Sequence, residues 1–554
     1  GGGGGGGVDD ADVDSSSQHH YHHALPTTAD FMLNCNPRGP LIVHVAKLFP
    51  KADCSRFDAL GRIVSGTARI GDSVRVLGEG FTPEDEEDMS VASITALWVG
   101  QSRYRVPISR AGAGNLVLVE GVDTTIVRTA TLVAEGYGNG NGYGNNDDDD
   151  NDDDSDPVHT FAPLHFQTQA VVKLAIEPHN PSELPKVVDG LRKLAKSYPL
   201  ASTRVEESGE HTLLGTGELF LDCALRDLRE LYSEVEVKVS DPVVQFCETA
   251  VDQSSLKCFA ETPNGRNKLT MIAEPLDKGL AEEIERGEAR LDMGRRQLAS
   301  YMERRHGWDV LSSRGLWAFG PDRQGPNCLL DDSLVAETDK SLLAAVKDSI
   351  IQGFQWGTRE GPLCDEPIRN VKFKLLEALI DPVPLHRGGG QMIPTARRVC
   401  YSAFLMANPR LMEPVYYSEI QTPADCIAAV YQVLARRRGH VTADVAKPGT
   451  PIFTVKAFLP VIESFGFESD LRCHTQGQTF CQSVFDHWQV VPGDPLDRNV
   501  VLRPLEPAPT SALAREFMVK TRRRKGMSDD VSVHKFFDDP MWLELARQDA
   551  EAEA

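Results

Sequence analysis

The sequence lacks the segments that place a protein in or across a membrane. No run of about 18 apolar residues occurs, so we expect no transmembrane helix. The chain begins with seven glycines and has no charged stretch followed by an apolar one, so we expect no signal peptide. The 11 cysteines form no C-x-x-C pair and are scattered from Cys35 to Cys481, which excludes a clustered-cysteine zinc site and favours reduced thiols in the cytosol or nucleus.

Catalytic motifs are also absent. A GTPase holds its phosphates with G-x-x-x-x-G-K-[ST], and this loop occurs nowhere. Asp58-Ala59-Leu60-Gly61 matches D-x-x-G but has no phosphate loop before it, so we interpret it as a turn between strands. Asn267-Lys268-Leu269-Thr270 lacks the acidic residue of N-K-x-D and is expected to be a solvated loop. Since no serine or cysteine lies in a recognisable nucleophile context, we predict no catalytic residue. We also predict no bound metal.

The charge is strongly acidic. The 554 residues carry a formal net charge of −23, and 41% of them are hydrophobic, close to a soluble globular average. Eight aspartates fall in one run, Asp147–Asp156. This run mimics nucleic acid, contacts a basic partner or, as we favour, forms a disordered spacer. Any nucleic-acid contact must therefore be confined to local basic patches.

Composition divides the first part of the chain into a tail, a β domain and an insertion. Residues 1–30 are low in complexity and are expected to be a solvated tail, although the histidines at 19, 20, 22 and 23 leave metal binding open. Residues 31–134 contain short β-branched runs punctuated by glycine, which predicts a small closed β-barrel. Residues 135–157 are Gly/Asn-rich and then Asp-rich, which predicts a flexible insertion.

The second part alternates strands with helices. Residues 158–241 show the order strand, helix, strand, strand, helix, strand, which is the split β-α-β unit of a ferredoxin-like fold. Residues 403–505 repeat this order, and residues 242–402 between them form a mixed α/β block. The tail, 506–554, begins with a basic helix. The predicted fold class is therefore multidomain α+β, with one β-barrel, two ferredoxin-like α/β sandwiches and one mixed α/β domain.

Several segments are similar to elongation factor 2 and its relatives. They include GFQWGTREGPLCDE (353–366), LHRGGGQMIPTARR (385–398), LMEPVYYSEIQTPADC (411–426), ARRRGHV (435–441) and SFGFESDLRCHTQGQTF (464–480). The similarity runs collinearly from about Asp30 to Asp549, which makes it far more specific than one short motif. Other stretches resemble the spliceosomal branch of this family more than the translational translocase. They are 61–88, 97–123, 180–199, 205–223, the turn Cys364-Asp365-Glu366 and 520–546.

The resemblance implies an order of domains. After a GTPase domain, the family has a translation-factor β-barrel (domain II), a ferredoxin-like domain III, a ribosomal-protein-S5-like domain IV and a ferredoxin-like domain V, with a tail that packs on domain IV. Because the phosphate loop is missing, we expect this chain neither to bind nor to hydrolyse GTP by itself. GTP and Mg²⁺ would bind the missing N-terminal domain, and we expect a truncated gene model.

The resemblance also implies partners. A member of the spliceosomal branch would be nuclear, with no membrane association, and would lie in the U5 small nuclear ribonucleoprotein particle (snRNP). Its protein partners would be the large scaffold protein and the helicase that unwinds U4/U6. U5 small nuclear RNA (snRNA) or the U4/U6.U5 tri-snRNP would be its RNA-containing partners.

The segment His386-Arg387-Gly388-Gly389-Gly390-Gln391 is the first candidate site. Three glycines permit backbone conformations closed to other residues and let a phosphate or another backbone approach. Arg387, with Arg397 and Arg398 downstream, could engage RNA phosphates. In the translocase the matching histidine is converted to diphthamide, which the spliceosomal resemblance does not imply for His386. The alternative is a tight strand-to-helix turn with incidental charge.

Basic and acidic runs supply further candidates. Arg436-Arg437-Arg438 either contacts a ribonucleoprotein or complements the dipole of the helix that it ends. Arg522-Arg523-Arg524-Lys525 is a nuclear-import patch, an RNA contact or a solvated helix face. The acidic barrel loop Glu84–Asp88 contacts a partner or is solvated.

Three functions stay open at this point. The first is a U5 snRNP component that acts in pre-mRNA splicing. The second is a ribosomal translocase, whose 386–391 loop would enter the decoding site, or a ribosome-maturation relative. The third is a truncated fragment without function. The acidic loop 83–88, the turn at Cys364 and the tail after Lys525 favour the first.

Overall fold

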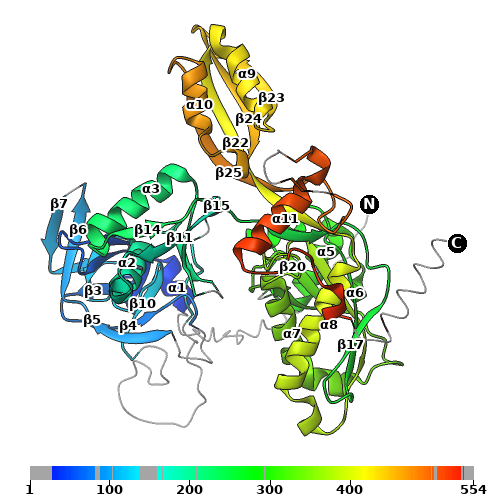
Figure 1. Cartoon of the computed structure of the whole chain (residues 1–554). Helices are drawn as coiled ribbons and strands as arrows, with labels where there is room; N and C mark the ends of the chain where they lie inside the picture. Colours follow the sequence, from blue (N-terminus) through cyan, green and yellow to red (C-terminus); the bar gives the residue numbers. More distant parts are fainter. Residues whose placement is uncertain are drawn as a thin grey trace, which may run out of the picture. The chain divides into compact units, whose positions relative to one another are not determined.

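The computed structural model describes residues 28–81, 88–102, 104–136, 159–164, 166, 168–206, 209–291, 293–500, 502–503, 508–537 and 541 (Figure 1). Its contacts divide the chain into two units, residues 1–164 with 195–199, and 165–194 with 200–554. The tail with its histidines, the aspartate run and most of the acidic barrel loop lie outside the described residues.

The first unit contains a β domain. Its elements are α1 (Thr28–Leu33), β1 (Ile42–Pro50), β2 (Phe57–Ser65), β3 (Thr67–Arg69), β4 (Ser73–Leu77), β5 (Met89–Ser93), β6 (Ala96–Gln101), β7 (Tyr104–Ile108), β8 (Arg110–Gly112), β9 (Leu116–Glu120) and β10 (Ala130–Ala134). Eight strands pair in the order β5-β4-β10-β1-β2-β9-β6-β7, and β3 and β8 form a separate ribbon. The strands β5 and β7 lie at the two ends of this order, and among the described strands they do not pair with each other.

One local prediction in this domain is wrong. Asp58–Gly61 is not a turn but lies inside β2, where its residues pair with β1 and β9. The Asp58 carboxylate is fully buried beside Arg105, and desolvation raises its pKa. The strand therefore holds this aspartate in the core, where the sequence motif was interpreted as a turn between strands.

Domain III begins the second unit and is ferredoxin-like. Its elements are β11 (Val172–Pro178), η1 (Pro181–Glu183), α2 (Leu184–Ser197), β12 (Ser202–Val205), β13 (His211–Gly215), α3 (Glu218–Asp227), η2 (Leu228–Tyr232), β14 (Val237–Val239) and β15 (Val243–Val244). The strands pair in the order β12-β13-β11-β14. This order and the two helices match the split β-α-β pattern predicted from the sequence.

Domain IV contains a five-stranded mixed sheet. Its elements are β17 (Cys258–Glu261), β18 (Lys268–Pro275), α4 (Leu280–Glu285), α5 (Arg295–His306), α6 (Val310–Arg314), β19 (Leu316–Gly320), β20 (Asn327–Asp331), α7 (Lys340–Arg359), β21 (Val371–Leu379), η3 (Pro384–Arg387) and α8 (Gly389–Leu405). The strand order is β17-β18-β21-β20-β19, and only the β20–β21 pair is parallel among the pairs that the structure describes.

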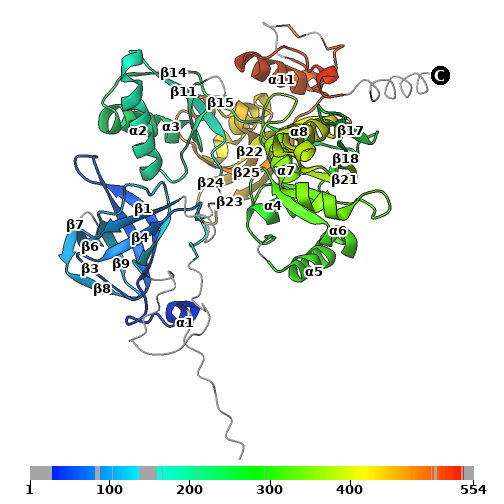
Figure 2. The same ribbon diagram turned by 90° about the horizontal axis from the view of Figure 1, so that it is seen from below.

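Alternation along β20 buries both faces of this sheet. Leu329 packs into the core that α7 and α8 share, whereas Cys328 and Leu330 pack with α4 and α5. Successive strand residues point to opposite faces, so these two helix pairs cover opposite sides of the sheet, which Figure 2 shows. The predicted solvated loop at Asn267–Thr270 is wrong, because Asn267 is buried and Lys268 begins β18.

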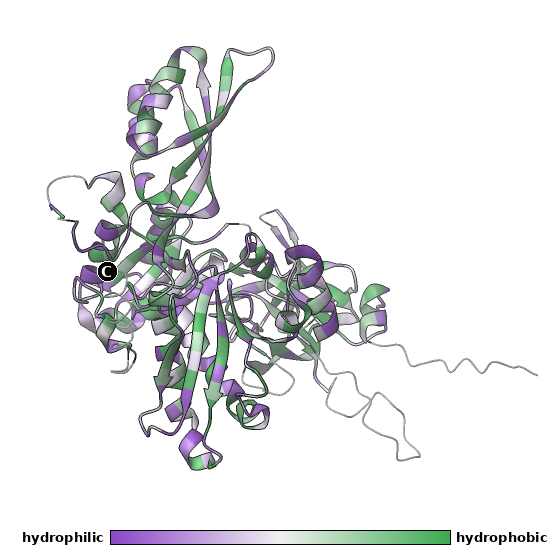
Figure 3. Ribbon diagram, turned by 90° about the vertical axis from the view of Figure 1, so that its right-hand side faces the viewer, coloured by the Kyte–Doolittle hydropathy of each residue, from purple (hydrophilic) through white to green (hydrophobic). Residues whose placement is uncertain are grey.

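Domain V is the second ferredoxin-like domain. Its elements are β16 (Cys247–Ala250), β22 (Pro409–Pro423), η4 (Ala424–Cys426), α9 (Ile427–Arg436), β23 (His440–Ala446), β24 (Ile452–Pro460), η5 (Val461–Glu463), α10 (Phe467–His474) and β25 (Phe480–Val490). The strands β25, β22, β24 and β23 lie in this order, and β16 pairs with the start of β22. Both helices cover one face of the sheet, which Figure 3 shows.

The tail packs against the core of domain IV. Its elements are η6 (Thr510–Ala512), α11 (Leu513–Arg524) and η7 (Val533–Lys535). Phe517 and Met518 of α11 share one core with Val399 and Phe404 of α8, and the rings of Phe246 and Phe517 stack at 5.4 Å. In the described part of the chain, no helix is long and apolar enough to cross a membrane. The same residues contain no cluster of His, Cys, Asp or Glu suited to a metal ion.

Candidate functional site

The predicted site at His386 lies where two connections of the domain IV sheet meet. The turn between β17 and β18 contributes Asn264 and Asn267, whose side-chain amides donate to the backbone oxygen of His386 at 2.9 and 2.8 Å. Asn267 also accepts from the backbone N–H of Asp381 at 2.9 Å, just after β21. The sheet thereby fixes the His386 backbone through the side chains of a neighbouring turn.

The imidazole of His386 is held from one side. Its Nδ1 lies 3.0 Å from Oδ2 of Asp381, and Nη1 of Arg266 lies 3.3 Å from the same carboxylate oxygen. The backbone N–H of Val383, followed by the side chains of His386 and Arg266, lowers the pKa of Asp381. The histidine side chain stays 28% exposed, so its ring is orientated by Nδ1 while part of it faces solvent.

The three glycines do not have the conformations that the sequence suggested. None has a positive φ, and Gly388 caps α8 at φ −61° and ψ 155°. A Cβ atom at Gly388 or Gly390 would meet nothing within 4 Å, and one at Gly389 would make only ordinary contacts. Backbone strain therefore does not require glycine here. The other predicted reason for the three glycines, close approach by a molecule outside the chain, stays a prediction.

The two residues that flank the glycines carry polar atoms without partners. Nη1 of Arg387 and Oε1 of Gln391 are buried and make no hydrogen bond within the part of the chain that the structure describes. An unsatisfied buried polar atom costs about 1–3 kcal/mol. A donor and an acceptor in this state lie on both sides of Gly388–Gly390, and a partner would satisfy them once the two side chains turn outward.

Downstream, Arg397 and Arg398 have different surroundings. Arg397 donates from Nε to the hydroxyl of Tyr401 at 2.8 Å and from Nη2 to Glu360 at 2.9 Å, and its guanidinium lies 3.9 Å from the centre of the Trp356 ring. Arg398 makes a long contact of 3.4 Å from Nη2 to the backbone oxygen of Glu261. The guanidinium group of Arg397 is therefore bound by other side chains of domain IV.

The run Arg436–Arg438 divides into one exposed residue and two internal ones. Arg437 donates to the backbone oxygens of Glu463 and Phe465, both at 2.7 Å. Arg438 donates through both terminal nitrogens to the carboxylate of Glu413, at 2.8 Å each. Only Arg436 of the three is exposed at the end of α9, so the run as a whole is not a single contact surface.

The basic end of α11 divides in the same way. Arg522 is buried and donates to the backbone oxygens of Leu363, Ser528 and Asp530. Arg523 pairs with Asp529 at 2.7 Å on the surface, and Arg524 is exposed. Lys525 lies 3.0 Å from Glu366 and donates to the backbone oxygen of Asp365 at 2.7 Å. Arg523 and Arg524 are thus the members of this run that a partner could reach.

The turn Cys364-Asp365-Glu366 surrounds a buried acid that the sequence did not reveal. Glu248 of β16 is fully buried and accepts from the backbone N–H groups of Leu363 at 2.9 Å, Cys364 at 2.8 Å and Glu366 at 3.3 Å. Burial raises the pKa of Glu248 to about 7, and the amide donors oppose that rise. Glu366 in turn lies between Lys173 of domain III and Lys525 of the tail.

Comparison with protein families places the domains in a known order. The models for Elongation factor Tu domain 2, Elongation factor G domain III, Elongation factor G domain IV and the Elongation factor G C-terminus match residues 59–133, 168–241, 290–408 and 410–499. The chain belongs to the elongation factor G family over these domains.

Curated relatives refine this placement. The chain is 66% identical over 517 residues to the 110 kDa U5 small nuclear ribonucleoprotein component CLO of Arabidopsis thaliana. The matched region covers 93% of this chain and 51% of that protein. It is 65% identical to the 109 kDa component GFL of the same plant, over 93% of this chain and 51% of the relative. It is 54% identical to Pre-mRNA-splicing factor cwf10 of Schizosaccharomyces pombe, over 91% of this chain and 49% of the relative. The chain thus spans about half the length of these relatives.

Proposed function

We propose that this chain acts in pre-mRNA splicing as part of a U5 snRNP. The observation that carries the proposal is the 66% identity, over 93% of the chain, to a U5 small nuclear ribonucleoprotein component. A nuclear location follows from this role.

Within such a particle the chain would act mainly by binding protein and RNA partners. The domain IV sheet holds the loop His386–Gln391, and the buried unpartnered atoms of Arg387 and Gln391 support a contact at this loop. Arg436, Arg523 and Arg524 are the other predicted contact residues whose side chains are exposed, whereas Arg398 is half-buried. The partners that we propose are the large scaffold protein of the particle, the helicase that unwinds U4/U6, and U5 snRNA. GTP and Mg²⁺ would bind a domain that this chain does not contain.

The test is to purify the endogenous protein from nuclear extract and sequence the RNA that accompanies it. Enrichment of U5, U4 and U6 snRNAs over a mock purification supports the proposal. Enrichment of ribosomal RNA without these three overturns it and assigns the protein to translation or ribosome maturation.

A tagged pair of variants then tests the loop. Arg387→Ala with Gln391→Ala removes the two groups that lack partners, whereas Arg437→Ala removes an arginine bonded inside domain V. If the loop contacts the particle, the first variant loses U5 snRNA from the purified material while its folded fraction stays that of the parent. Equal recovery of U5 snRNA with both variants argues against a contact at the loop.

A further inference from the structure

Helix α5 of domain IV is basic in a strongly acidic chain. Its sequence RRQLASYMERRH contains four arginines against one acidic residue, Glu303, while the whole chain has a net charge of −23. Leu298 and Met302, four residues apart, pack into the core beside α4. Residues four apart share a helix face, so Arg296, Ser300 and Arg304 lie together on another face, away from that core.

The arginines of this helix differ in their partners. Arg305 donates from Nε to Glu283 at 3.0 Å and lies 3.8 Å from Glu288. Arg296 and Arg304 make no ion pair or hydrogen bond with any residue that the structure describes. Two guanidinium groups on one helix face are therefore available to an anion from outside.

Helix stability does not explain Arg296. It lies in the first turn of α5, which contains no acidic residue, and the N-cap residue Gly294 makes no side-chain cap. Cations are unfavourable near the positive end of the helix dipole. The helix dipole disfavours a cation at this position, so a contact between Arg296 and a group outside the helix would explain why an arginine occurs there.

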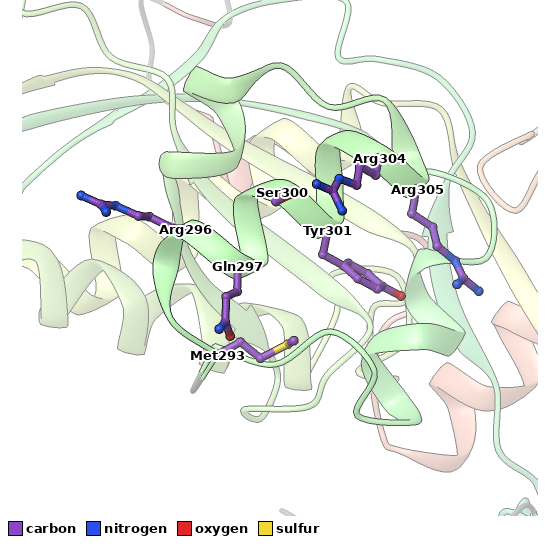
Figure 4. Close-up of a pocket in the computed structure, with 7 residues that line it drawn as sticks. All are labelled: Met293, Arg296, Gln297, Ser300, Tyr301, Arg304 and Arg305. Carbon is purple, nitrogen blue, oxygen red and sulfur yellow. The ribbon is translucent and has the colours of Figure 1, made fainter. Parts of the chain in front are cut away.

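A shallow pocket of about 550 Å³ lies along this helix. Met293, Arg296, Ser300, Tyr301, Arg304 and Arg305 line it, together with Gln297. Figure 4 shows Arg296 and Arg305 extending in opposite directions, with Tyr301 between them. The hydroxyl of Tyr301 donates to Glu283 at 2.6 Å, which fixes the ring, and the side chain is only partly buried.

We propose that the α5 pocket binds a single-stranded RNA segment, with backbone phosphates on Arg296 and Arg304 and a base against the ring of Tyr301. The two arginines are eight residues apart, about 12 Å along the helix axis, so they can hold separate phosphates of one strand. Guanidinium groups match phosphate oxygens bidentately, and bases stack on aromatic rings without sequence preference. An acidic peptide would satisfy the arginines but would leave the tyrosine ring without a stacking partner.

The first test measures RNA binding by the purified 554-residue chain. Fluorescence anisotropy follows a fluorescein-labelled oligouridine of about 12 nucleotides, within the usual range of single-strand sites, at two salt concentrations. The double variant Arg296→Gln, Arg304→Gln should bind at least about tenfold more weakly, with a salt slope smaller by about 1.4 because two phosphate contacts are lost. Arg192→Gln with Arg323→Gln is the matched control, because both arginines are exposed and lie off the pocket. Equal losses in the two double variants overturn the proposal.

The second test separates the ring from the hydroxyl. Tyr301→Phe keeps the ring and should bind the RNA nearly as the parent does, whereas Tyr301→Leu should weaken binding about tenfold. Thermal melts of both variants control for folding, since both lose the bond to Glu283. Equal affinities for the two variants overturn the stacking contact.

A third test distinguishes RNA from an acidic protein. Fluorescein-labelled oligoglutamate replaces the RNA in the same assay. Tight binding of this peptide that depends on Arg296 and Arg304, with unchanged RNA binding in their double variant, overturns the proposal in favour of an acidic partner. All three tests use the purified chain with a synthetic RNA or peptide, so they are independent of whether the protein purifies with an snRNP.

Discussion

The buried carboxylate of Glu248 accepts a 2.8 Å hydrogen bond from the backbone N–H of Cys364, more than a hundred residues further along the chain. Leu363 and Glu366 donate to the same carboxylate, so both of its oxygens are used. This carboxylate ties β16 to the turn at which domain IV, the tail and Lys173 of domain III come together.

Stability should fall as pH rises through the titration of Glu248. Burial raises the pKa of its folded form to about 7, above the unfolded value near 4.5, so folding takes up a proton between these values. The free energy of unfolding should therefore decrease from about pH 4.5 to about pH 7, by up to about 3 kcal/mol from this group, and stay level above. Urea unfolding followed by tryptophan fluorescence at pH 5 and pH 7.5 measures it.

Glu248→Gln isolates this contribution. The amide cannot ionise, so the difference in stability between the two pH values should shrink. At pH 5 the parent carboxyl is protonated, and its O–H faces the same backbone N–H donors that the NH₂ group of glutamine would face, so the two proteins should have similar stability at pH 5. Glu337→Gln, at an exposed position, is the control. Parallel pH profiles for Glu248→Gln and the parent would contradict the assignment.

Arg438 should be structural, although it lies in a basic run. Arg438→Ala leaves the carboxylate of Glu413, which is 2% exposed, without its bidentate partner. Loss of one partner of a buried pair costs about 3–5 kcal/mol. Arg436→Ala, at the exposed end of α9, should change stability by less than about 0.5 kcal/mol. Denaturant unfolding of the two variants gives the comparison, and similar stabilities would show that the run is one solvated surface.

Arg522 should hold the tail on domain IV. Arg522→Ala leaves the backbone oxygens of Leu363, Ser528 and Asp530 without their donor. Hydrogen bonds from charged donors contribute about 1.5–3 kcal/mol each, so the tail should exchange its amide hydrogens and be cleaved by protease markedly faster. Arg523→Ala removes only an exposed pair with Asp529, of about 0–1 kcal/mol. If both variants protect the tail equally, Arg522 does not anchor it.

Gly390→Ala should separate folding from contact at the His386 loop. A Cβ has open space there and α8 favours alanine over glycine, so the free energy of unfolding should stay the same or rise by about 0.5–1 kcal/mol. If a phosphate or a backbone approaches this position, recovery of U5 snRNA with the tagged variant should fall. Unchanged recovery would show that glycine is not needed for close approach, and a loss of stability would contradict the observed geometry.

Much of the fold could be read from local patterns. The strand and helix order of residues 168–241 is set by periodic apolar positions, and the structure has the same order. Local patterns misled at Asp58 and Asn267, because a short motif does not reveal that a strand continues through it. The loop at His386 was found from its sequence, but Asn264, Asn267, Asp381 and Arg266, which hold it, were not. Asn264, Arg266 and Asn267 come from another turn, and Asp381 lies five residues before His386. The contacts that join them depend on how β17, β18 and β21 pair.

The sequence by itself therefore determined the domain order, the absence of a phosphate loop and the family. Each of these depends on residues that are close together in the chain or collinear with relatives. Tertiary structure decided which charges are available. Arg436 and Arg438 are neighbours in a basic run, yet Glu413 lies where it can bind only one of them. Arg296 and Arg304 stay available because no acidic side chain among the described residues reaches them. Proximity in the chain cannot reveal this difference, because the partners that neutralise a charge are brought to it only when distant strands and helices pack.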